Sequence, residues 1–421
     1  MTLKLVLTGL VCLLAFDGCT IGPRAATRDR AFIEYWPPAK PSEWKLAIKD
    51  NIDMKGVVTT AGSEFLAKHA PPAKRDAACL GIARERHVPI VGKTNLSEFA
   101  VAPSGINEYF GTPESPLSHG WKRIAGGSSC GSAVAVANRE ADVAFGTDTA
   151  GSIRVPAACC GVVGLKTTRG LVSLKGIYPI EPEILDTVGP LARDVAGTAE
   201  GMGLLESGFA SRYAAAKAQM PSAQRIRVGR LMLKGTNPKI DAAVDAALAK
   251  TGFQVVRLSD RFRDQWDQAK KDGDTMAAVG IWLNYQKYGN DGDISGRTKS
   301  GILLGRLDYG DRYRQALSRQ RAWQGDLEAV LEKVDFIALP TMQNIPPHMT
   351  LNFRVGVMDE RVLGMQNTVP VNVAGNPALA VPIPLAHAGF PAASLQLIGR
   401  YRSEAALLNA GRLVEAAVKI K

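Results

Sequence analysis

Cysteine and histidine are scarce in this sequence: its 421 residues contain six cysteines and five histidines. No two cysteines form a CxxC pair and no histidine stands at ligand spacing from a cysteine, so we predict no metal site and no cofactor. Removal of residues 1–18 as a leader would leave five cysteines, an odd number. In a chain of this length that count excludes a disulfide framework.

Long basic runs are also missing. Lys and Arg number 51 against 40 Asp and Glu, which gives a net charge of +11. These basic residues are scattered, with no run of five or six and no aromatic residues between them, as a nucleic-acid site would have. We therefore interpret the charge as a solvated basic surface and expect no nucleic-acid partner.

Two familiar loop motifs are incomplete. VPIVGKT ends like a phosphate-binding loop but has His87 where the first glycine is required, and GTDTAGS has Gly146 and Gly151 but no lysine after them. The residues around Ser152 are AGSIR, which is not the GxSxG nucleophile elbow. Neither stretch can therefore bind a triphosphate as a P-loop does, and a Ser-His-Asp hydrolase is poorly supported.

An apolar run begins the chain, but it is too short to cross a bilayer. MTLKLVLTGLVCLLAF has one lysine and then the mostly apolar Leu5–Phe16, which is typical of a signal peptide. We predict a signal peptide over residues 1–18 and export to the periplasm or the exterior. FDGC places Cys19 where a bacterial lipoprotein carries its lipid, so a lipid anchor at Cys19 is a further hypothesis. A buried amino-terminal strand or helix is the alternative.

Strand and helix patterns alternate along the rest of the chain. IRVGRLML, NPKIDAAVDAALAKTG and FQVVRL predict a strand, a helix ended by Gly252 and a second strand, the βαβ pattern. VDFIALP, ALAVPIP and SLQLIG predict buried strands, and SEAALLNAGRLVEAAVK predicts a last helix. DAACLGIARERH predicts a helix capped by Asp76. No linker divides the body, so we predict one α/β domain over residues 19–421, with a large, mostly buried sheet.

Without histidine, a serine nucleophile needs another base, and a lysine whose charge is disfavoured by burial can serve. Lys49 ends the apolar strand pattern in WKLAIKDNID, where a side chain can point into a cleft. The alternative is a solvated lysine beside Asp50.

ADVAFGTDTAGSIRVPAA predicts a strand that breaks at Gly146 and a tight turn that leads to Ser152. Small residues in the turn let successive backbone N–H groups converge on one point, as in an oxyanion hole. The alternative is a Ser-capped turn with Asp148 and Arg154 paired.

Several motifs together resemble the amidase signature family of serine hydrolases. GGSSCGSAVAVA followed by FGTDTAGSIRVPAACCGVVGLKTT is similar to the family's signature. The similarity extends over AIKDNIDMKGVVTTAGS, VPIVGKTNLSEFA, NVAGNPALAVPIP and LQLIGR, and so covers nearly everything from Lys45 onward. It implies a large mixed sheet covered by helices on both faces. It also implies a hydrolase that cleaves a small-molecule amide to an acid and ammonia or an amine.

The resemblance implies a role for each of three polar residues. The family's base lysine falls on Lys49, its bridging serine, held by a cis peptide bond, on Ser128, and its nucleophile on Ser152. Ser129 supports the turn or caps the helix that follows.

The resemblance also assigns the turn. Oxyanion-hole amides fall on Thr149, Ala150, Gly151 and Ser152, and Asp148 and Arg154 become supports of the turn.

Three positions depart from the family pattern. Ala150 and Cys130 replace glycines, and Ala125 replaces a frequent proline. Ala150 would cost stability if the turn required a positive φ there. Cys130 is either a packed small residue or a reactive thiol.

Two other functions stay open at this stage. Some relatives are amidotransferase subunits that act on tRNA-linked substrates with protein partners, and a catalytically silent binding protein on the same fold is the third interpretation. The divergent region between about Gly170 and Pro340 would select the substrate. The sequence makes no prediction of oligomeric state.

Overall fold

The computed structural model describes residues 26–27, 29–38, 40, 42–219, 223–349, 357–387 and 389–418. The predicted signal peptide, residues 1–18, and Cys19 lie outside these ranges, so export and lipid anchoring stay predictions. In the described part of the chain, no helix is long and apolar enough to cross a membrane.

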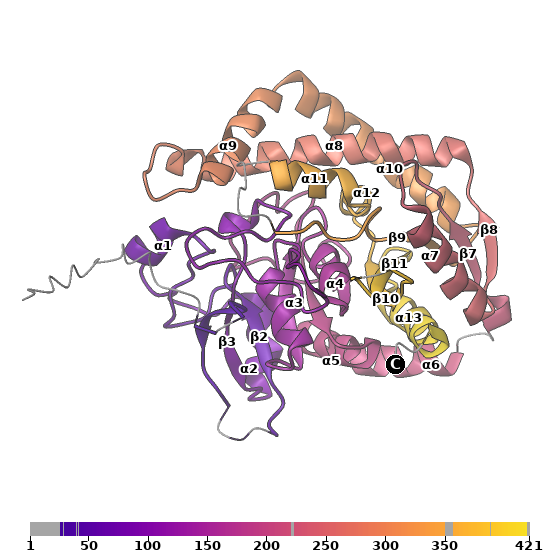
Figure 1. Ribbon diagram of the computed structural model, residues 1–421, viewed down its shortest axis with the longest axis horizontal. Helices are drawn as coiled ribbons and strands as arrows, with labels where there is room; N and C mark the ends of the chain where they lie inside the picture. Colours follow the sequence, from indigo (N-terminus) through magenta and orange to yellow (C-terminus); the bar gives the residue numbers. More distant parts are fainter. Residues whose placement is uncertain are drawn as a thin grey trace, which may run out of the picture.

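One mixed sheet organises the described chain (Figure 1). Its eleven described strands stand in the order β1-β3-β2-β4-β6-β5-β10-β11-β9-β7-β8. The edge pair β1–β3 is antiparallel, the strands β3-β2-β4 and β9-β7-β8 are parallel, and the strands from β4 to β9 pair antiparallel. The strands are β1 (Phe32–Tyr35), β2 (Leu46–Lys49), β3 (Ile90–Thr94), β4 (Val143–Asp148), β5 (Val163–Lys166), β6 (Thr187–Ala192), β7 (Arg227–Arg230), β8 (Gln254–Arg257), β9 (Phe336–Pro340), β10 (Ala378–Pro384) and β11 (Ala392–Ile398).

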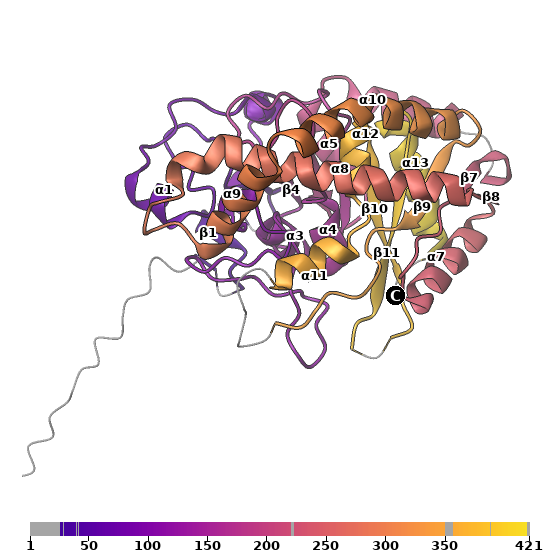
Figure 2. The same cartoon turned by 90° about the horizontal axis from the view of Figure 1, so that it is seen from above.

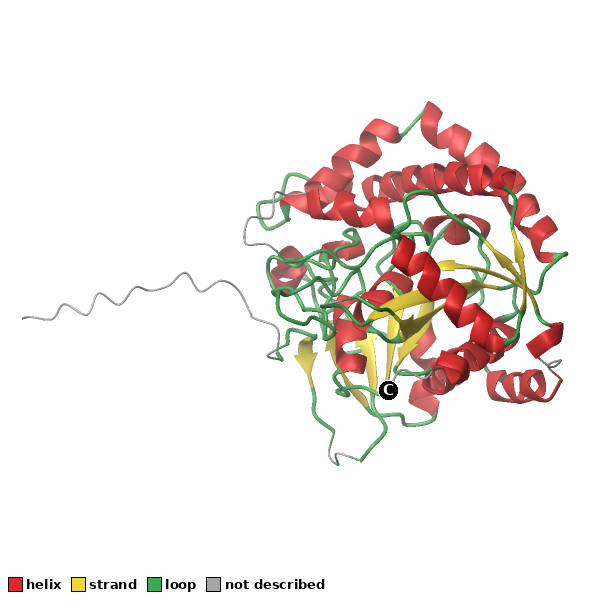
Figure 3. Cartoon of the chain, turned by 45° about the vertical axis from the view of Figure 1, so that its right-hand side comes forward, coloured by secondary structure: helices red, strands yellow, loops and turns green. Residues whose placement is uncertain are grey.

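Helices cover both faces of this sheet (Figure 3). The long α8 runs across the top of the molecule in Figure 1 beside α9 and α10, and Figure 2 shows it from above. The described helices are α1 (Glu64–His69), α2 (Gly81–Glu85), α3 (Cys130–Ala137), α4 (Arg154–Cys160), α5 (Val195–Leu205), α6 (Phe209–Gln219), α7 (Pro238–Thr251), α8 (Asp260–Tyr285), α9 (Gly296–Asp308), α10 (Asp311–Leu331), α11 (Val357–Met365), α12 (Val369–Ala374) and α13 (Glu404–Val418). The predicted α/β fold with a mixed, mostly buried sheet is confirmed.

Alternation along the strands explains why the sheet is buried on both sides. In β4, Val143 and Phe145 belong to one apolar cluster with Met202 of α5, whereas Ala144 between them belongs to another with Val134 of α3. Successive side chains of a strand point to opposite faces, so a strand covered on both faces must be apolar at nearly every position. This is the pattern that the sequence shows.

The predicted βαβ unit is confirmed. β7 and β8 pair in parallel, and α7 connects them. The Asn237 side chain accepts a hydrogen bond from Lys239 N at the start of α7, and Gly252 ends the helix with φ 77°. Gly is favoured there because it adopts this left-handed conformation without steric cost.

Two local predictions were wrong. β4 does not break at Gly146 but continues to Asp148, paired with β6. A Cβ at Gly146 would lie 2.9 Å from Ser129 Oγ, so this glycine permits a close approach between segments and does not make a turn. Asp76 does not cap a helix either, because its carboxylate binds Lys55 N and Arg84 instead.

The packing of α9 on α8 makes a prediction about stability. A Cβ at Gly305 would collide with the backbone carbonyl of Ala278, so Gly305→Ala should force the helices apart and lower the free energy of unfolding by about 1–3 kcal/mol. Gly301→Ala in the same helix is the matched control. Its Cβ would lie 3.4 Å from Ile281 Cγ2, an ordinary contact, and alanine favours helix by up to about 1 kcal/mol. Thermal unfolding of both variants checks this, and equal melting temperatures would contradict it.

Candidate active site

Lys49 is the last residue of β2, and its side chain is fully buried. Its Nζ lies 2.7 Å from Ser128 Oγ and 2.8 Å from Thr147 Oγ1. Burial lowers the pKa of Lys49 to about 7, because loss of water disfavours the ammonium form. A solvated lysine paired with Asp50 is therefore ruled out, and the Asp50 carboxylate instead pairs with Lys93 at 2.8 Å.

Ser128 lies in the loop that leads directly into α3. The peptide bond between Gly127 and Ser128 is cis. The next residue, Ser129, donates from Oγ to the backbone oxygen of Thr147 at 3.3 Å and makes no side-chain cap on α3. Ser129 therefore braces the end of β4 and does not cap the helix.

The turn that carries Ser152 is joined to the loop that carries Ser128. Ser129 N donates to Ser152 O at 3.2 Å. Ser152 is partly exposed, whereas Lys49 and Ser128 are buried. Among the described residues, none accepts a hydrogen bond from the backbone amides of residues 149–152.

Asp148 and Arg154 hold this turn from inside. Both are fully buried, and Arg154 Nη2 lies 2.8 Å from Asp148 Oδ1. The other carboxylate oxygen accepts from Ile153 N at 3.1 Å. Burial by itself would raise the pKa of Asp148, but the charge and hydrogen bonds of Arg154 and a bond from Asn372 outweigh it and hold the pKa at about 2. The carboxylate is therefore ionised at neutral pH, and the predicted ion pair is present.

The family departures are accommodated without strain. Positive φ occurs at Gly151, at 138°, and not at Ala150, so the stability cost that a left-handed Ala150 would carry does not arise. Cys130 is fully buried, and burial raises the pKa of its thiol to about 12. A thiol that stays protonated is a poor nucleophile, so Cys130 is a packed residue.

The structure adds five polar residues that sequence reasoning missed. Thr147 contacts Lys49, Asn51 donates to Thr147 at 3.1 Å, and Asp186 accepts from Thr149 Oγ1 at 2.6 Å. From the carboxy-terminal part, Asn372 donates to Asp148 Oδ1 at 2.9 Å and Thr368 donates to Ala150 O.

A sequence signal existed for two of these five. Thr147 and Asn51 stand inside GTDTAGS and KDNID, stretches that already held candidate residues. Thr368 and Asn372 lie more than 200 positions after the turn that they support, with no local pattern to connect them.

A second buried lysine shows why burial alone does not identify a base. Burial, and then the charge of Arg154, lowers the pKa of Lys166 to about 7 as well. Its Nζ donates to the backbone oxygens of Thr167 and Asn376, both at 2.9 Å. Neither partner can give up a proton, unlike the Ser128 hydroxyl beside Lys49.

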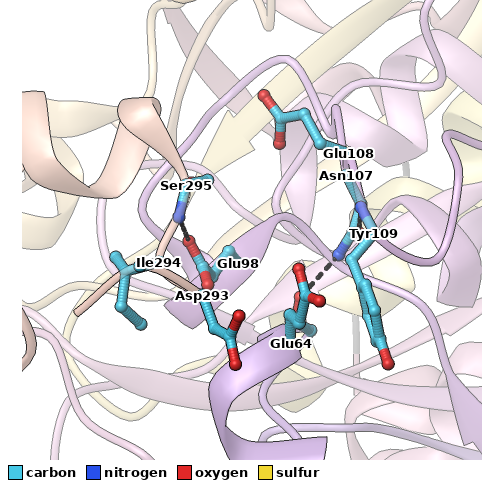
Figure 4. Close-up of a pocket in the computed structure, with 10 residues that line it drawn as sticks. Glu64, Glu98, Asn107, Glu108, Tyr109, Asp293, Ile294 and Ser295 are labelled. Atoms are coloured by element: carbon cyan, nitrogen blue, oxygen red, sulfur yellow. Dashed lines mark hydrogen bonds between the residues drawn. The ribbon is translucent and has the colours of Figure 1, made fainter. Parts of the chain in front are cut away.

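A cavity of about 340 Å³ lies away from these residues, between α1 and the loop before α9 (Figure 4). Its lining includes Glu64, Glu98, Glu108 and Asp293, and none of the predicted site residues. Glu98 is buried, and its carboxylate accepts from Ser63, Ser295 and Thr298. It therefore ties loops together. Within the described residues, no group of His, Cys, Asp or Glu side chains could hold a metal ion.

Comparison with known proteins identifies the family. The family model Amidase matches residues 45–408. A glutamyl-tRNA(Gln) amidotransferase subunit of Halobacterium salinarum is 32% identical over 407 residues, which cover 88% of this chain and 94% of that protein.

Solved structures agree. 6-Aminohexanoate cyclic dimer hydrolase complexed with substrate superimposes with a TM-score of 0.77 at 26% identity, over 90% of this chain and 85% of the other. Native peptide amidase from Stenotrophomonas maltophilia superimposes with a TM-score of 0.73 at 27% identity, over 95% of this chain and 90% of the other. The fold and its site thus define an amidase-type protein. The chain belongs to the amidase signature family.

The buried ion pair makes a prediction that depends on pH. Asp148 has a folded pKa of about 2 against an ordinary value of 3.8, so its pairing stabilises the fold above the unfolded pKa and is lost as pH falls toward 2. Arg154→Met leaves a buried carboxylate unpaired and should lower the free energy of unfolding by about 3–5 kcal/mol at neutral pH. Burial then raises the pKa of Asp148, so the deficit should shrink as pH is lowered and the carboxylate is protonated.

The matched control is Arg193→Met. Arg193 pairs with Asp142 at 3.1 Å, but both side chains are partly exposed, so its loss should cost about 0–1 kcal/mol. Urea unfolding at several pH values measures both variants. Equal losses in the two, or a deficit for Arg154→Met that does not change with pH, would contradict the account.

Proposed function

We propose that this protein hydrolyses carboxylic amides through an acyl-enzyme on Ser152. The observation that carries the proposal is the fully buried Lys49, whose Nζ lies 2.7 Å from Ser128 Oγ in a loop hydrogen-bonded to the turn of Ser152. A neutral amine next to a serine hydroxyl is a base with a proton path, which a serine nucleophile without histidine requires. Membership of the amidase family supports the same chemistry.

In the proposed mechanism, neutral Lys49 takes a proton from Ser128 as Ser128 takes one from Ser152. The Ser152 oxygen then attacks the amide carbonyl carbon, and negative charge develops on the carbonyl oxygen. The amides of Thr149, Ala150, Gly151 and Ser152 would stabilise that charge, and a single such donor is typically worth about 3 kcal/mol.

The relay then runs in reverse. Ser128 passes the proton to the departing nitrogen, since an amine leaves poorly unless it is protonated. Water then attacks the acyl carbon while its proton passes through Ser128 to Lys49. The ester bond to Ser152 breaks, the proton returns through Ser128 to the Ser152 oxygen, and the acid is released. Lys49 returns to its neutral form, so one amide and one water give an acid and an amine or ammonia.

The second candidate function is that of an amidotransferase subunit. The curated relatives favour it: those of Halobacterium salinarum and Natronomonas pharaonis, 32% and 34% identical, are both subunits of glutamyl-tRNA(Gln) amidotransferase. In that role the same acyl-enzyme step would release ammonia from an amide for transfer to a tRNA-linked substrate, together with protein partners.

One assay separates the two candidates. The purified chain is tested alone on peptide amides, aryl acylamides, aliphatic amides and glutamine, and then for amide formation on glutamyl-tRNA with a cell extract added. Turnover of the amides other than glutamine by the chain alone supports the hydrolase. Turnover only with extract and tRNA supports the amidotransferase role.

The location of the protein bears on the same choice. Export, proposed from residues 1–18, would favour the hydrolase, and cell fractionation tests whether the protein is exported.

The proposed roles predict which substitutions abolish turnover. Ser152→Ala, Ser128→Ala and Lys49→Met should each lower kcat by several orders of magnitude with the fold retained, because a proton relay fails when any member is lost. Ser132→Ala is the matched control. Ser132 is a buried serine of α3 that hydrogen-bonds Thr94 and lies outside the relay. Ser152→Ala turning over at the parental rate would refute the mechanism.

The lowered pKa of Lys49 predicts the pH dependence. Only the neutral amine accepts a proton, so kcat/KM should be constant above the pKa of about 7 and fall about tenfold per pH unit below it. Initial rates across this range measure the profile. A rate that rises only near pH 10, where an ordinary lysine titrates, would contradict a buried neutral base.

A further inference from the structure

The amide of Asn51 has an incomplete set of hydrogen bonds. Asn51 is 1% exposed, and its Nδ2 donates to Thr147 Oγ1 at 3.1 Å and to the backbone oxygen of Tyr178 at 3.4 Å. A carbonyl oxygen only accepts, so the Tyr178 contact identifies which end of the amide is nitrogen. The other end, Oδ1, accepts a hydrogen bond from no residue of the described chain.

A small cavity adjoins this amide. Its volume is about 10 Å³, and its lining includes Asn51, Thr147, Thr149, Tyr178 and Asp186. A cavity of this size with several polar groups can hold one water molecule. Because Asn51 Oδ1 is a buried acceptor, a donor in this cavity removes the cost of leaving it unpaired.

The Thr147 hydroxyl has a proton to donate and needs an acceptor for it. Thr147 Oγ1 accepts a hydrogen bond from Asn51 Nδ2 and lies 2.8 Å from Lys49 Nζ. The hydroxyl proton must point either at Lys49 or into the cavity, since the described residues offer it no other acceptor. A neutral amine has a single lone pair, so a proton from Thr147 would compete with Ser128 for it.

We propose that Asn51 is a positioning residue for the base: with one water in this cavity, it makes Thr147 an acceptor toward Lys49 and leaves the lone pair of the amine to Ser128. The water accepts a hydrogen bond from the Thr147 hydroxyl and donates one to Asn51 Oδ1, so that each of these polar groups has a partner. Asn51 touches no substrate in this account. The inference rests on the proposed function, in which neutral Lys49 draws a proton through Ser128.

The ionisable groups that face Lys49 come from other elements. They are Asp148 at the end of β4, Asp186 before β6 and the Cys130 thiol at the start of α3. None of these is bonded to Asn51, and Asp186 is held by Thr149, Ile180 and Glu181. A change at Asn51 therefore alters the hydrogen bonds of the base and leaves its charged neighbours in place.

The test is the rate at which a fluorophosphonate labels Ser152, measured from about pH 5 to pH 9 and located by mass spectrometry. Labelling requires activation of Ser152 but no known amide substrate. Asn51→Leu keeps the approximate size and removes both polar ends. We expect its plateau rate to fall about tenfold or more, with the midpoint of the profile moved to lower pH, because a proton from Thr147 stabilises the neutral amine.

A merely structural role gives a different profile. If the loss of Asn51 only loosened the site, water would reach Lys49 and its midpoint would move up toward the ordinary lysine value. Asn376→Leu is the matched control. It removes a buried amide, bonded to Gly399 O at 3.0 Å, from a site remote from Lys49, and should leave the rate and the midpoint at their parental values.

A double variant tests the competition itself. Thr147→Val added to Asn51→Leu removes the competing proton. The double variant should therefore label at least about threefold faster than Asn51→Leu alone, a difference of the size expected when two neighbouring residues are coupled. A double variant no faster than the single one overturns the inference, as does Asn51→Leu at the wild-type rate while the wild type labels at Ser152. A wild type that fails to label at Ser152 overturns the proposed function as well, which keeps the two failures distinct.

A measurement on the unaltered protein covers the case in which the variants do not fold. A high-resolution crystal structure should contain a water within hydrogen-bonding distance of both Asn51 Oδ1 and Thr147 Oγ1. A dry cavity, or a water bonded to neither atom, would overturn the inference.

Discussion

The desolvated ammonium of Lys49 is the constraint on which the rest of the site depends. Its burial lowers the pKa to about 7, so the amine can lose its charge at neutral pH, and this is possible only because covered strands and loops exclude water around it. The hydroxyls of Ser128 and Thr147 are the partners of Nζ in the described chain. Burial also lowers the pKa of Lys166 to about 7, but this lysine is bound by carbonyl oxygens and has no route for a proton.

The turn around Ser152 is stabilised from three directions. Asp148 is bound by Arg154 and by Asn372, Thr149 by Asp186, and the carbonyl of Ala150 by Thr368. These bonds occupy the side chains and carbonyls of the turn but leave its amides without acceptors in the described chain. Free, fixed amides are what an anionic oxygen requires, and fixing them in advance removes the cost of reorganising them during reaction.

Much of the fold could be read from the sequence because strands buried on both faces are apolar at nearly every position, and because Gly252 marks a helix end. The reading failed where a glycine had a tertiary role. Gly146 looks like a strand break, yet it lies inside β4, where Ser129 approaches too closely for any side chain. Periodicity carries no information about such an approach.

The sequence by itself determined the family, the sheet and the identity of the polar residues in three glycine-rich stretches. Resemblance to the family's motifs indicated Lys49, Ser128 and Ser152, but not what surrounds them. Only the tertiary structure decided that Lys49 is buried, that Thr147 and Asn51 stand behind it, and that Asn372 reaches Asp148 from more than 200 residues away. The physical reason is that a pKa and a hydrogen-bond direction depend on neighbours in space, and the chain brings those neighbours together only when the sheet is complete.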